Sequence, residues 1–358
     1  MEKISFKETD EAFRPQEAFQ DDLLAKRILH LANEIQRPFW YMEENFQRYA
    51  FNHLKDESLS VPQRIFKGTL NGIGASLSVF LVFGAFALKG LSSALSRREF
   101  TYWEGFGLEN DQEKKVLHLN ACMLPGGFPM IFGGMDGAGL RMEGLKTFIQ
   151  REDPDIFFLS EFTQTQSGKL FECFKRDYKH FFIDIGPNAC GMDSSMAVVS
   201  KVPVVRSPRF FPTRVPAENE QKLFYRGYFH IETKARNYLY MHLHPGDSKC
   251  AKEIRRRQLI EIKAVTEKES NGKPWAIVGD MNVDRRLDEY REVEALSLQD
   301  PLFKKYGIVV TTTDGSGESI DGIWLTGGND ELSVQAKLPC GNSKTPLSDH
   351  LAIIASIS

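Results

Sequence analysis

A stretch of about 21 residues without a charged side chain limits the possible folds most, because it is roughly as long as a helix that crosses a bilayer. The stretch, GTLNGIGASLSVFLVFGAFAL, runs from Gly68 to Leu88, and its small residues suit close packing of helices. Basic residues flank both ends, so the positive-inside rule gives no orientation. We predict a membrane-spanning or membrane-embedded helix over residues 67–95. A buried helix of a soluble domain, or a hairpin dipping into the membrane, is the alternative.

The region before this stretch, residues 1–66, has the periodicity of an amphipathic helix. Its apolar residues recur at a spacing of three or four, at Phe19, Leu23, Leu24, Ile28, Leu31 and Ile35. Pro38 is expected to interrupt this helix. The aromatic-rich stretch FWYMEENFQRYAF that follows is typical of packing within the protein, on a partner or at a membrane surface. We assign this helical region no chemistry.

Charge and cysteine usage narrow the class of protein. The chain of 358 residues has a formal net charge of −3, which is not typical of a protein that binds polyanions with its whole surface. Its five cysteines are scattered and form no CxxC pair, which argues against a disulfide framework or a zinc site. The first 20 residues are charged and do not resemble a cleavable signal peptide. We expect a membrane protein whose C-terminal domain lies in a reducing compartment such as the cytoplasm; its orientation and oligomeric state stay open.

The pattern changes after a polar connection, which we expect to be a linker over residues 96–115. From Val116 to Ser358, short apolar segments alternate with turns. Seven of them predict strands: VLHL, DIFFLSEF, SMAVVSK, YLYMHLH, WAIVGD, SIDGIWL and HLAIIASI. Helices are expected from Leu140 to Gln150 and from Lys249 to Glu269. This order predicts one α/β domain with mixed or antiparallel sheets. The sequence has no GxGxxG or GxxxxGK[ST] motif, so a glycine-rich phosphate loop is not indicated.

The stretch WAIVGDMNVDRR, Trp275 to Arg286, follows an apolar strand directly with Asp280 and Asn282. In an extended chain alternate residues point the same way, so both side chains would converge on one point. A β-turn is the alternative, because Gly, Asp and Asn are ordinary turn residues. The stretch alone does not decide between the two.

Other predicted strands also carry polar residues at or near their ends. These residues are Asn120, Glu161, His242, Asp321, Asp349 and His350. Each alone has an ordinary structural explanation, such as a capping Asn or a hydrogen-bonded core His. A set of carboxylates at strand ends, however, is costly unless a cation compensates the charge. Carboxylate and amide oxygens without cysteine are hard ligands, which predicts Mg²⁺ or a similar divalent ion rather than Zn²⁺.

Together and in this order, these residues resemble the endonuclease/exonuclease/phosphatase superfamily of magnesium-dependent phosphoesterases. The resemblance covers roughly Val116 to Ser358. Its most specific motifs are GDMN and SDH, supported by the Glu of LSEF and the Asn of HLNACML. The resemblance implies a four-layer α/β/β/α sandwich for this domain. It also implies that GDMN is a catalytic strand end and not a turn.

The resemblance further implies a metal site. Glu161 corresponds to the main metal ligand, Asn120 lies beside it, and Asp349 lies at or near the metal. The expected cofactor is Mg²⁺, with Mn²⁺ as a substitute.

Catalytic roles follow from the same resemblance. Asp280 corresponds to the acid that orients and deprotonates the attacking water, and Asn282 to the amide that positions the nucleophile and the phosphate. His350 corresponds to the histidine that contacts the phosphate, Asp321 to the acid that fixes its ring, and His242 to the residue supporting the leaving side. The chemistry agrees, since an anionic diester needs cationic neutralisation and a positioned water. Asp280 must be ionised, and Asp321 should raise the pKa of His350.

Charge also bears on the substrate. Residues 116–358 carry 30 Lys and Arg against 31 Asp and Glu, a net of −1, whereas a nuclease needs a basic surface. The run EIRRRQ, with Arg255–Arg257, is a candidate for a local basic patch, although a charge run on a helix is usually a solvated face. The tryptophan–cysteine–aspartate–arginine stretch of inositol 5-phosphatases is missing, and ESIDGIWL stands in its place.

The closest local resemblance is to neutral sphingomyelinases, through LHLNACML, MAVVSKVPV, RGYFHIETKARNYLYMHLHPGD and IVGDMNVD. The sequence therefore predicts a membrane-associated, Mg-dependent phosphodiesterase that hydrolyses a phospholipid headgroup, with residues 68–88 binding the membrane. A nuclease acting on DNA or RNA is the alternative enzyme. An inactive interaction module of the same fold is the alternative of another class. It would lack at least one of Glu161, Asp280, Asn282 and His350, and all four are present.

Overall fold

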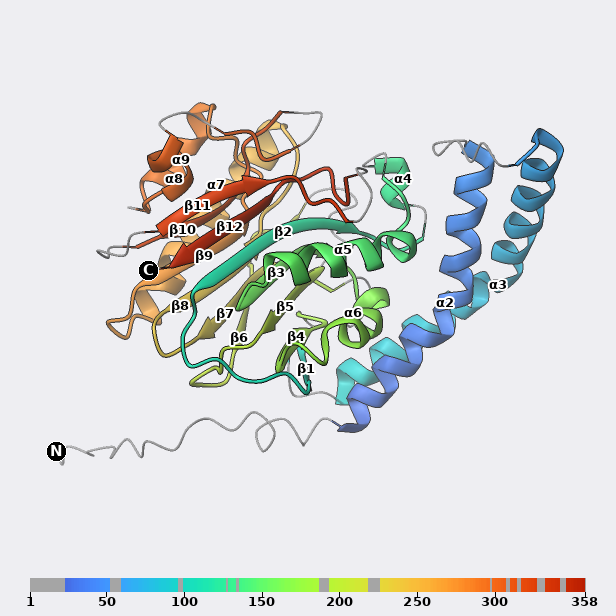
Figure 1. The fold of residues 1–358 in the computed structure, drawn as a ribbon, viewed down its shortest axis with the longest axis horizontal. Coiled ribbons are helices and arrows are strands. Elements are labelled where there is room, and N and C mark those ends of the chain that lie inside the picture. Colours follow the sequence, from blue (N-terminus) through green and yellow to red (C-terminus); the bar gives the residue numbers. More distant parts are fainter. Residues whose placement is uncertain are drawn as a thin grey trace.

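The chain forms a helical hairpin that stands beside an α/β sandwich (Figure 1). This arrangement comes from a computed structural model. It describes residues 23–51, 59–95, 99–126, 128–132, 135–186, 193–217, 226–296, 298–306, 310–313, 317–326, 332–341 and 346–357. Phe19, which we expected in the first helix, lies outside the described residues.

The hairpin consists of α2 (Leu23–Phe51) and α3 (Val61–Leu95). The two helices are antiparallel, since Gly68 lies against Tyr49 at one end and Ser92 Oγ donates to the Ala25 carbonyl (2.7 Å) at the other. The predicted apolar helix is confirmed as one continuous helix. Its most apolar window has a mean hydropathy of 1.8 and is only 22% buried, so it is not the core helix of a soluble domain.

Pro38 does not interrupt the first helix, and that expectation was wrong. The α2 helix continues through Pro38 from Leu23 to Phe51, and it changes direction part-way along its length (Figure 1). A proline inside a helix removes one hydrogen bond and kinks the axis, at a cost of roughly 3 kcal/mol. Contacts with α3 on both sides of the proline hold the two halves together.

The first sheet has seven strands in the order β1-β4-β5-β3-β2-β12-β11. They are β1 (Thr101–Glu104), β2 (Lys115–Met123), β3 (Ile156–Phe162), β4 (His180–Ile183), β5 (Met196–Ser200), β11 (Leu332–Lys337) and β12 (Ala352–Ile357). Only β2 and β3 pair in parallel. The expected linker over residues 96–115 therefore needs correction, because it contributes β1, which pairs with β4 at the edge of the sheet.

The second sheet has five strands in the order β10-β9-β8-β7-β6. They are β6 (Arg209–Pro212), β7 (Gly227–Glu232), β8 (Asn237–His242), β9 (Trp275–Asp280) and β10 (Asp321–Leu325). Here β8 and β9 are the parallel pair. Both sheets are mixed, as the sequence predicted.

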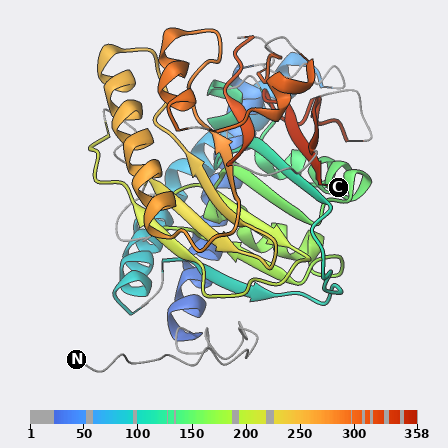
Figure 2. The same ribbon diagram turned by 90° about the vertical axis from the view of Figure 1, so that its left-hand side faces the viewer.

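Helices cover the outer face of each sheet. The helices on the first sheet are α5 (Ala138–Glu152) and α6 (Ser167–Phe174); those on the second are α7 (Lys249–Lys268) and the short α8 (Arg291–Glu294). Short helices α4 (Phe128–Phe132), η2 (Gln164–Gln166), η4 (Asp288–Tyr290) and α9 (Pro301–Tyr306) lie in connections. Figure 2 shows the sheets between α5 and α7. The four-layer α/β/β/α sandwich and both predicted long helices of this domain are confirmed.

The alternation of side chains along β2 explains how the sandwich positions polar groups. Leu117 and Leu119 point outward into the core beneath α5 and α6, while Val116 points into the core between the sheets. His118 and Asn120 share the inward face with Val116, because successive side chains of a strand point to opposite faces. The strand therefore places apolar residues in both cores and polar residues where the inner core ends.

Candidate active site

The site lies where two parallel strand pairs end. Asn120 on β2 and Glu161 on β3 lie at the same edge of the first sheet, because these strands run in parallel. On the second sheet, His242 pairs in register with Asp280, and Asp321 pairs with Asp280 from the other side. The two sheets therefore bring five polar side chains, from distant parts of the chain, to one end of the inner core.

Asn120 joins the carboxylates of the two sheets. Its Nδ2 donates to Glu161 Oε1 (3.2 Å) and to Asp280 Oδ2 (3.1 Å), and its Oδ1 accepts the backbone N–H of Cys122 (3.2 Å). The amide thus presents donors to the carboxylates. In this orientation Asn120 holds Glu161 and Asp280 in place, and its oxygen would face a metal only after the amide turned over.

The GDMN stretch is a strand end and a turn at once. The strand ends at Asp280, and Asn282 adopts the left-handed conformation (φ 52°). Its N–H donates to Asp280 Oδ1 (2.8 Å), and its Nδ2 donates to the Leu243 carbonyl (3.1 Å). The implication that this stretch is not a turn therefore needs correction, because the strand ends at Asp280 and a local turn at Asn282 fixes the Asp280 carboxylate.

Two further backbone features support this corner of the site. Gly279 has a φ of 147°, and a Cβ there would lie 1.9 Å from the Met241 carbonyl oxygen, so only glycine fits between β8 and β9. Glu161 also has a positive φ of 53° at the end of β3. Such conformations cost about 1–3 kcal/mol in non-glycine residues and are typical of functional sites.

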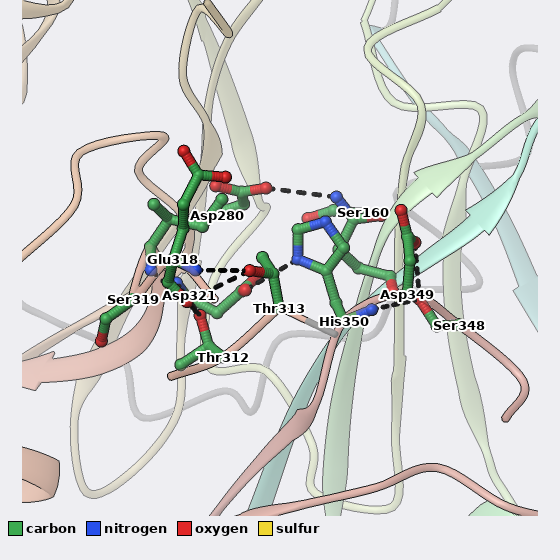
Figure 3. Close-up of polar contacts among 12 residues, drawn as sticks. Ser160, Asp280, Thr312, Thr313, Glu318, Ser319, Asp321, Ser348, Asp349 and His350 are labelled. Carbon is green, nitrogen blue, oxygen red and sulfur yellow. Dashed lines mark hydrogen bonds and ion pairs between the residues drawn. The ribbon is translucent and has the colours of Figure 1, made fainter. Parts of the chain in front are cut away.

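His350 and Asp321 form an ion pair at the opposite side of the site. Asp321 Oδ2 lies 2.8 Å from His350 Nδ1. Ser348 Oγ accepts the His350 N–H (3.1 Å) and donates to the Asn120 carbonyl (2.5 Å), which ties the SDH loop to β2. Figure 3 shows the His350 ring directed toward Asp321, and the Thr312–Thr313 segment beside Asp321. These contacts fix the orientation of the ring.

The charges of this pair follow from their mutual attraction. Burial alone would lower the pKa of His350, but Asp321, aided by Asp280 and Asp349, raises the pKa well above its usual value. Burial alone would raise the pKa of Asp321, but His350 lowers it. His350 is therefore an imidazolium at neutral pH, as the sequence predicted.

Behind this pair lies a buried histidine that the sequence did not single out. His118 Nε2 is 3.1 Å from Ser160 Oγ, which is 3.0 Å from Tyr240 Oη. His118 Nδ1 lies 3.8 Å from Asp321 Oδ1, and neither atom has a hydrogen-bond partner among the described residues. Burial lowers the pKa of His118 to about 4, so its ring is neutral. It stands beside Asp321 as a neutral group inside the core.

The remaining carboxylates have raised pKa values. Burial, and then Asp321, raises the pKa of Asp280 to about 7, although His350 opposes the shift. Removal of water also raises the pKa of Glu161, with Asp349 adding to the effect. Both carboxylates therefore hold their charge at a cost that a nearby cation would offset.

Two groups stand close to these carboxylates. His242 Nε2 lies 3.8 Å from Asp280 Oδ2, and burial, together with Arg226, lowers its pKa well below the usual value, so it is neutral. Arg226, just before β7, donates from Nη1 to the His242 carbonyl (3.5 Å) and interacts electrostatically with Glu161 and Asp280. Arg226 is a residue of the site that was not predicted from the sequence. A lone basic residue before an apolar strand was its only signal.

The donor set fits a divalent metal ion. When all four are ionised, the carboxylates of Glu161, Asp280, Asp321 and Asp349 exceed the positive charges of His350 and Arg226 by two. Ligand atoms of Asp280, Asp321 and His350 lie within 4.8 Å of one another. However, His350 is charged and bonded to Asp321, so this group is an ion pair beside a base. Glu161 offers the better metal position, with the partly exposed Asp349 near it.

Every predicted site residue lies among the described residues. The structure gathers Asn120, Glu161, His242, Asp280, Asn282, Asp321 and His350 into one hydrogen-bonded and electrostatic cluster. Asp349 lies at the rim, where its Oδ1 is 3.3 Å from Ser348 Oγ. Arg141 of α5 supports the rim from below by donating to the Ala121 carbonyl (2.8 Å) and to the Leu347 carbonyl.

Comparison with models of known protein families identifies the family of this domain. The model of the Endonuclease/Exonuclease/phosphatase family matches residues 126–350. The chain belongs to this family. Its members hydrolyse phosphoesters, so the protein is a hydrolase of ester bonds. The match includes all the predicted site residues except Asn120, which precedes it.

Solved structures share the fold of this family member. Beta toxin from Staphylococcus aureus, in a mutant with bound magnesium ions, has a TM-score of 0.55 at 18% identity and covers 69% of this chain and 100% of its own. Sphingomyelinase C from Streptomyces griseocarneus has a TM-score of 0.50 at 18% identity and covers 69% of this chain and 100% of its own. TDP2 from Caenorhabditis elegans has a TM-score of 0.50 at 15% identity and covers 88% of this chain and 93% of its own. At these identities the likeness shows the fold alone. The curated proteins contain no match.

Proposed function

We propose that this family member is a membrane-associated, divalent-metal-dependent phosphodiesterase that cleaves a phospholipid headgroup in the manner of sphingomyelinases. The observation that carries the proposal is the position of the hairpin. The apolar α3 belongs to a hairpin that stands on the side of the sandwich where β2 and β3 end (Figure 1). A site at this edge, beside an apolar helix, suits a substrate that lies in a bilayer.

The proposed chemistry uses the groups of the site in three roles. Asp280, fixed by the N–H of Asn282 and by Asn120, accepts a proton from the attacking water. The His350 imidazolium, oriented by Asp321, stabilises negative charge on the phosphate. His242 lies beside the base, on the side that we assign to the leaving group.

We assign the metal position to Glu161, with Asp349 and Asn120 beside it, and expect Mg²⁺, which Mn²⁺ can replace. Hard oxygen ligands and the excess of two negative charges support this choice. When bound, the ion supplies positive charge to the phosphate oxygens. A beta toxin structure of the same fold holds magnesium ions.

A nuclease is the alternative, and the one basic run singled out from the sequence does not favour it. Arg255 is buried and paired with Glu289 (2.7 Å), while Arg256 and Arg257 both bond Glu253 on the same helix. Two carboxylates therefore offset the three arginines to a net charge of +1, which is small for a surface that has to neutralise several phosphates. The gathered site also argues against an inactive interaction module.

The test compares substrates at two salt concentrations. Purified full-length protein with Mg²⁺ is assayed on sphingomyelin vesicles, phosphoinositide vesicles and plasmid DNA, with Asp280→Asn as the inactive control. We expect sphingomyelin cleavage that changes little with salt. DNA cleavage that exceeds lipid cleavage and collapses with added salt would replace the lipid proposal with the nuclease.

A further inference from the structure

We propose that α3 lies flat on the bilayer and does not cross it, with its outward face in the lipid and α2 packed against its opposite face. The inference deepens the proposed membrane association and rests on it, but it is independent of the chemistry of the site. The apolar surface concerned, which we call the outer face, consists of large exposed side chains: Ile65, Phe66, Leu70, Ile73, Leu77, Val79, Phe80, Phe83 and Leu91.

The two sides of α3 differ in the size of their side chains. The side toward α2 is a narrow seam of Gly68, Ala75, Ser78, Val82, Ala85, Lys89 and Ser92. Large residues crowd the outer face, where Phe80 is 65% exposed and Phe83 is 68% exposed. Small residues at the seam let α2 approach closely, as in membrane helix pairs. In water, the outer face would be a large unsatisfied apolar surface.

The helix α2 cannot enter hydrocarbon with α3. It carries charged residues along its whole length: Lys26, Arg27, Glu34, Arg37, Glu43, Glu44 and Arg48. Arg37 and Glu34 form a solvent-exposed ion pair (2.7 Å). The contacts of Ala25 with Ser92 and of Met42 with Gly74 fix the antiparallel register. This register places the ion pair level with Phe80 and Phe83, in the middle of the apolar stretch.

A spanning α3 would therefore carry an exposed ion pair to the middle of the bilayer, or would have to separate from α2. The first is strongly unfavourable because charged side chains at that depth lose their water. The second would expose the seam and break the contacts that run along both helices. A flat position avoids both, since the charges of α2 stay on the aqueous side.

The hairpin is attached to the sandwich, so a flat α3 also orients the active site. Lys26 Nζ donates to the Tyr102 carbonyl (2.6 Å), and Trp40 packs edge-on against Phe128 (5.9 Å between centroids). Lys89, near the end of α3, is buried beside Asp184 and Asp193, which follow β4 and precede β5. These contacts fix which side of the sandwich faces the membrane, namely the side where β2 and β3 end.

Lipid suits the outer face better than a second protein helix does. Its large side chains spread over about half of the helix circumference, whereas a helix that packs on protein needs an apolar stripe of only about 100°. The helix is 35 residues long, or roughly 50 Å, and has no charge between Lys67 and Lys89. A partner helix would cover one strip of this convex surface, but a bilayer covers all of it.

The first experiment tests how the chain lies in the membrane. Full-length protein with different epitope tags before Met1 and after Ser358 is reconstituted into phosphatidylcholine vesicles by detergent removal and treated with external protease. If α3 lies flat, chains that survive carry both tags, because both ends lie on one side. Survivors that carry only one tag would show a spanning helix and overturn the inference.

The second experiment measures depth along α3. Nitroxide labels are placed at Leu70, Leu77 and Phe83 after the four cysteines other than the buried Cys122 are replaced by serine. A flat helix gives the three labels equal depth. A spanning helix gives depths that differ by up to about 20 Å over these 13 steps, and that result would overturn the inference.

A matched pair of variants tests the outer face itself. Leu77→Asp with Phe80→Asp should reduce flotation with phosphatidylcholine vesicles at least about tenfold, whereas Ile260→Asp, at an exposed apolar site on α7, should not. Both proteins should still hydrolyse a soluble nitrophenyl phosphodiester. The inference would be overturned if the wild-type chain did not float with the vesicles. It would also be overturned if the double variant lost a dimer while its flotation stayed unchanged, because the outer face would then bind a second chain and not lipid. Turnover of detergent-dispersed sphingomyelin tests the proposed function separately.

Discussion

The hairpin and the sandwich place their apolar residues in opposite ways. In the sandwich, large side chains such as Phe157 and Phe158 are fully buried, and the buried polar groups include those that form the site. In α3 the small residues are inside and Phe80 and Phe83 are outside. Each exposed Phe forgoes about 1.5–3 kcal/mol of burial in water. The sandwich therefore completes its core by itself, whereas the hairpin needs a further apolar surface.

This difference separates two sets of residues that variants can address independently. Changes at the strand ends should alter hydrolysis and leave membrane binding intact. Changes on α3 should alter membrane binding and leave hydrolysis of a soluble diester intact.

Removal of divalent metal should have the largest effect. We expect excess chelator to abolish hydrolysis and added Mg²⁺ or Mn²⁺ to restore it, because the carboxylates of the site need a cation. Glu161→Ala should raise the metal concentration required for half-maximal activity, whereas Asp288→Ala, at an exposed residue, should not. Flotation with vesicles should be unchanged in all cases. Full activity in excess chelator would contradict the metal assignment.

Asp280→Asn should lower turnover by at least about two orders of magnitude, since it keeps the shape but removes the proton acceptor. The fold should survive, because a neutral amide avoids the free-energy cost of burying a negative charge beside Asp321. Circular dichroism and flotation should match those of the unaltered chain. Near-normal turnover by a folded Asp280→Asn protein would remove Asp280 from its role as base.

The sequence predicted the elements whose apolar runs are long. All seven strands named from the sequence exist, and so do α5 and α7, since fully buried strands read as continuous apolar segments. The strands that were not named, β1, β4, β6, β7 and β11, are mostly short or at the edges of the sheets. Their existence depends on pairing with distant segments, which local sequence does not reveal.

The sequence predicted the site residues for a different reason. Each polar residue at a strand end has an ordinary explanation by itself, but the whole set in this order does not, so Glu161 and Asp280 were singled out together. Asn282 was found, but its left-handed turn was not, because spacing does not specify φ. His118 looked like an ordinary core residue, and only the packing of β2 against β10 brings it to Asp321. The sequence did not predict which residues of α3 form the seam either, because this depends on how α2 packs against α3.

The pH profile should report the ion pair of the site. In the proposed mechanism Asp280 acts ionised and His350 acts protonated. Activity should therefore rise with pH as Asp280 ionises, and fall as His350 loses its proton at a pH well above 6.5. The pKa of Asp280 is about 7 without metal, and a bound cation should move this limb to lower pH.

Asp321→Asn should move the alkaline limb to lower pH, because burial then lowers the pKa of His350. We expect a loss of at least about tenfold at neutral pH, one pKa unit being a factor of ten. The free energy of unfolding should depend on pH in the same direction. Protonated His350 stabilises the fold fully at any pH below the pKa that it has in the unfolded chain. This contribution disappears as the pH rises through the pKa that it has in the folded protein. An unmoved alkaline limb in Asp321→Asn would show that His350 does not set it.

The smallest effect should come from the seam of the hairpin, and it tests whether close packing holds α2 to α3. A Cβ at Gly74 would lie 2.4 Å from Met42 Sδ, whereas a Cβ at Gly84 would meet nothing within 4 Å. Gly74→Leu should therefore displace the Met42 side chain from between the helices and destabilise the hairpin by about 1–3 kcal/mol. Gly84→Leu adds the same side chain on the open side and should preserve the seam. Hydrogen exchange of the α2 amides should increase in the first variant only, while turnover of a soluble diester stays the same in both. Equal exchange in the two variants would mean that the seam does not hold the hairpin, and the flat position of α3 would then lose its structural basis.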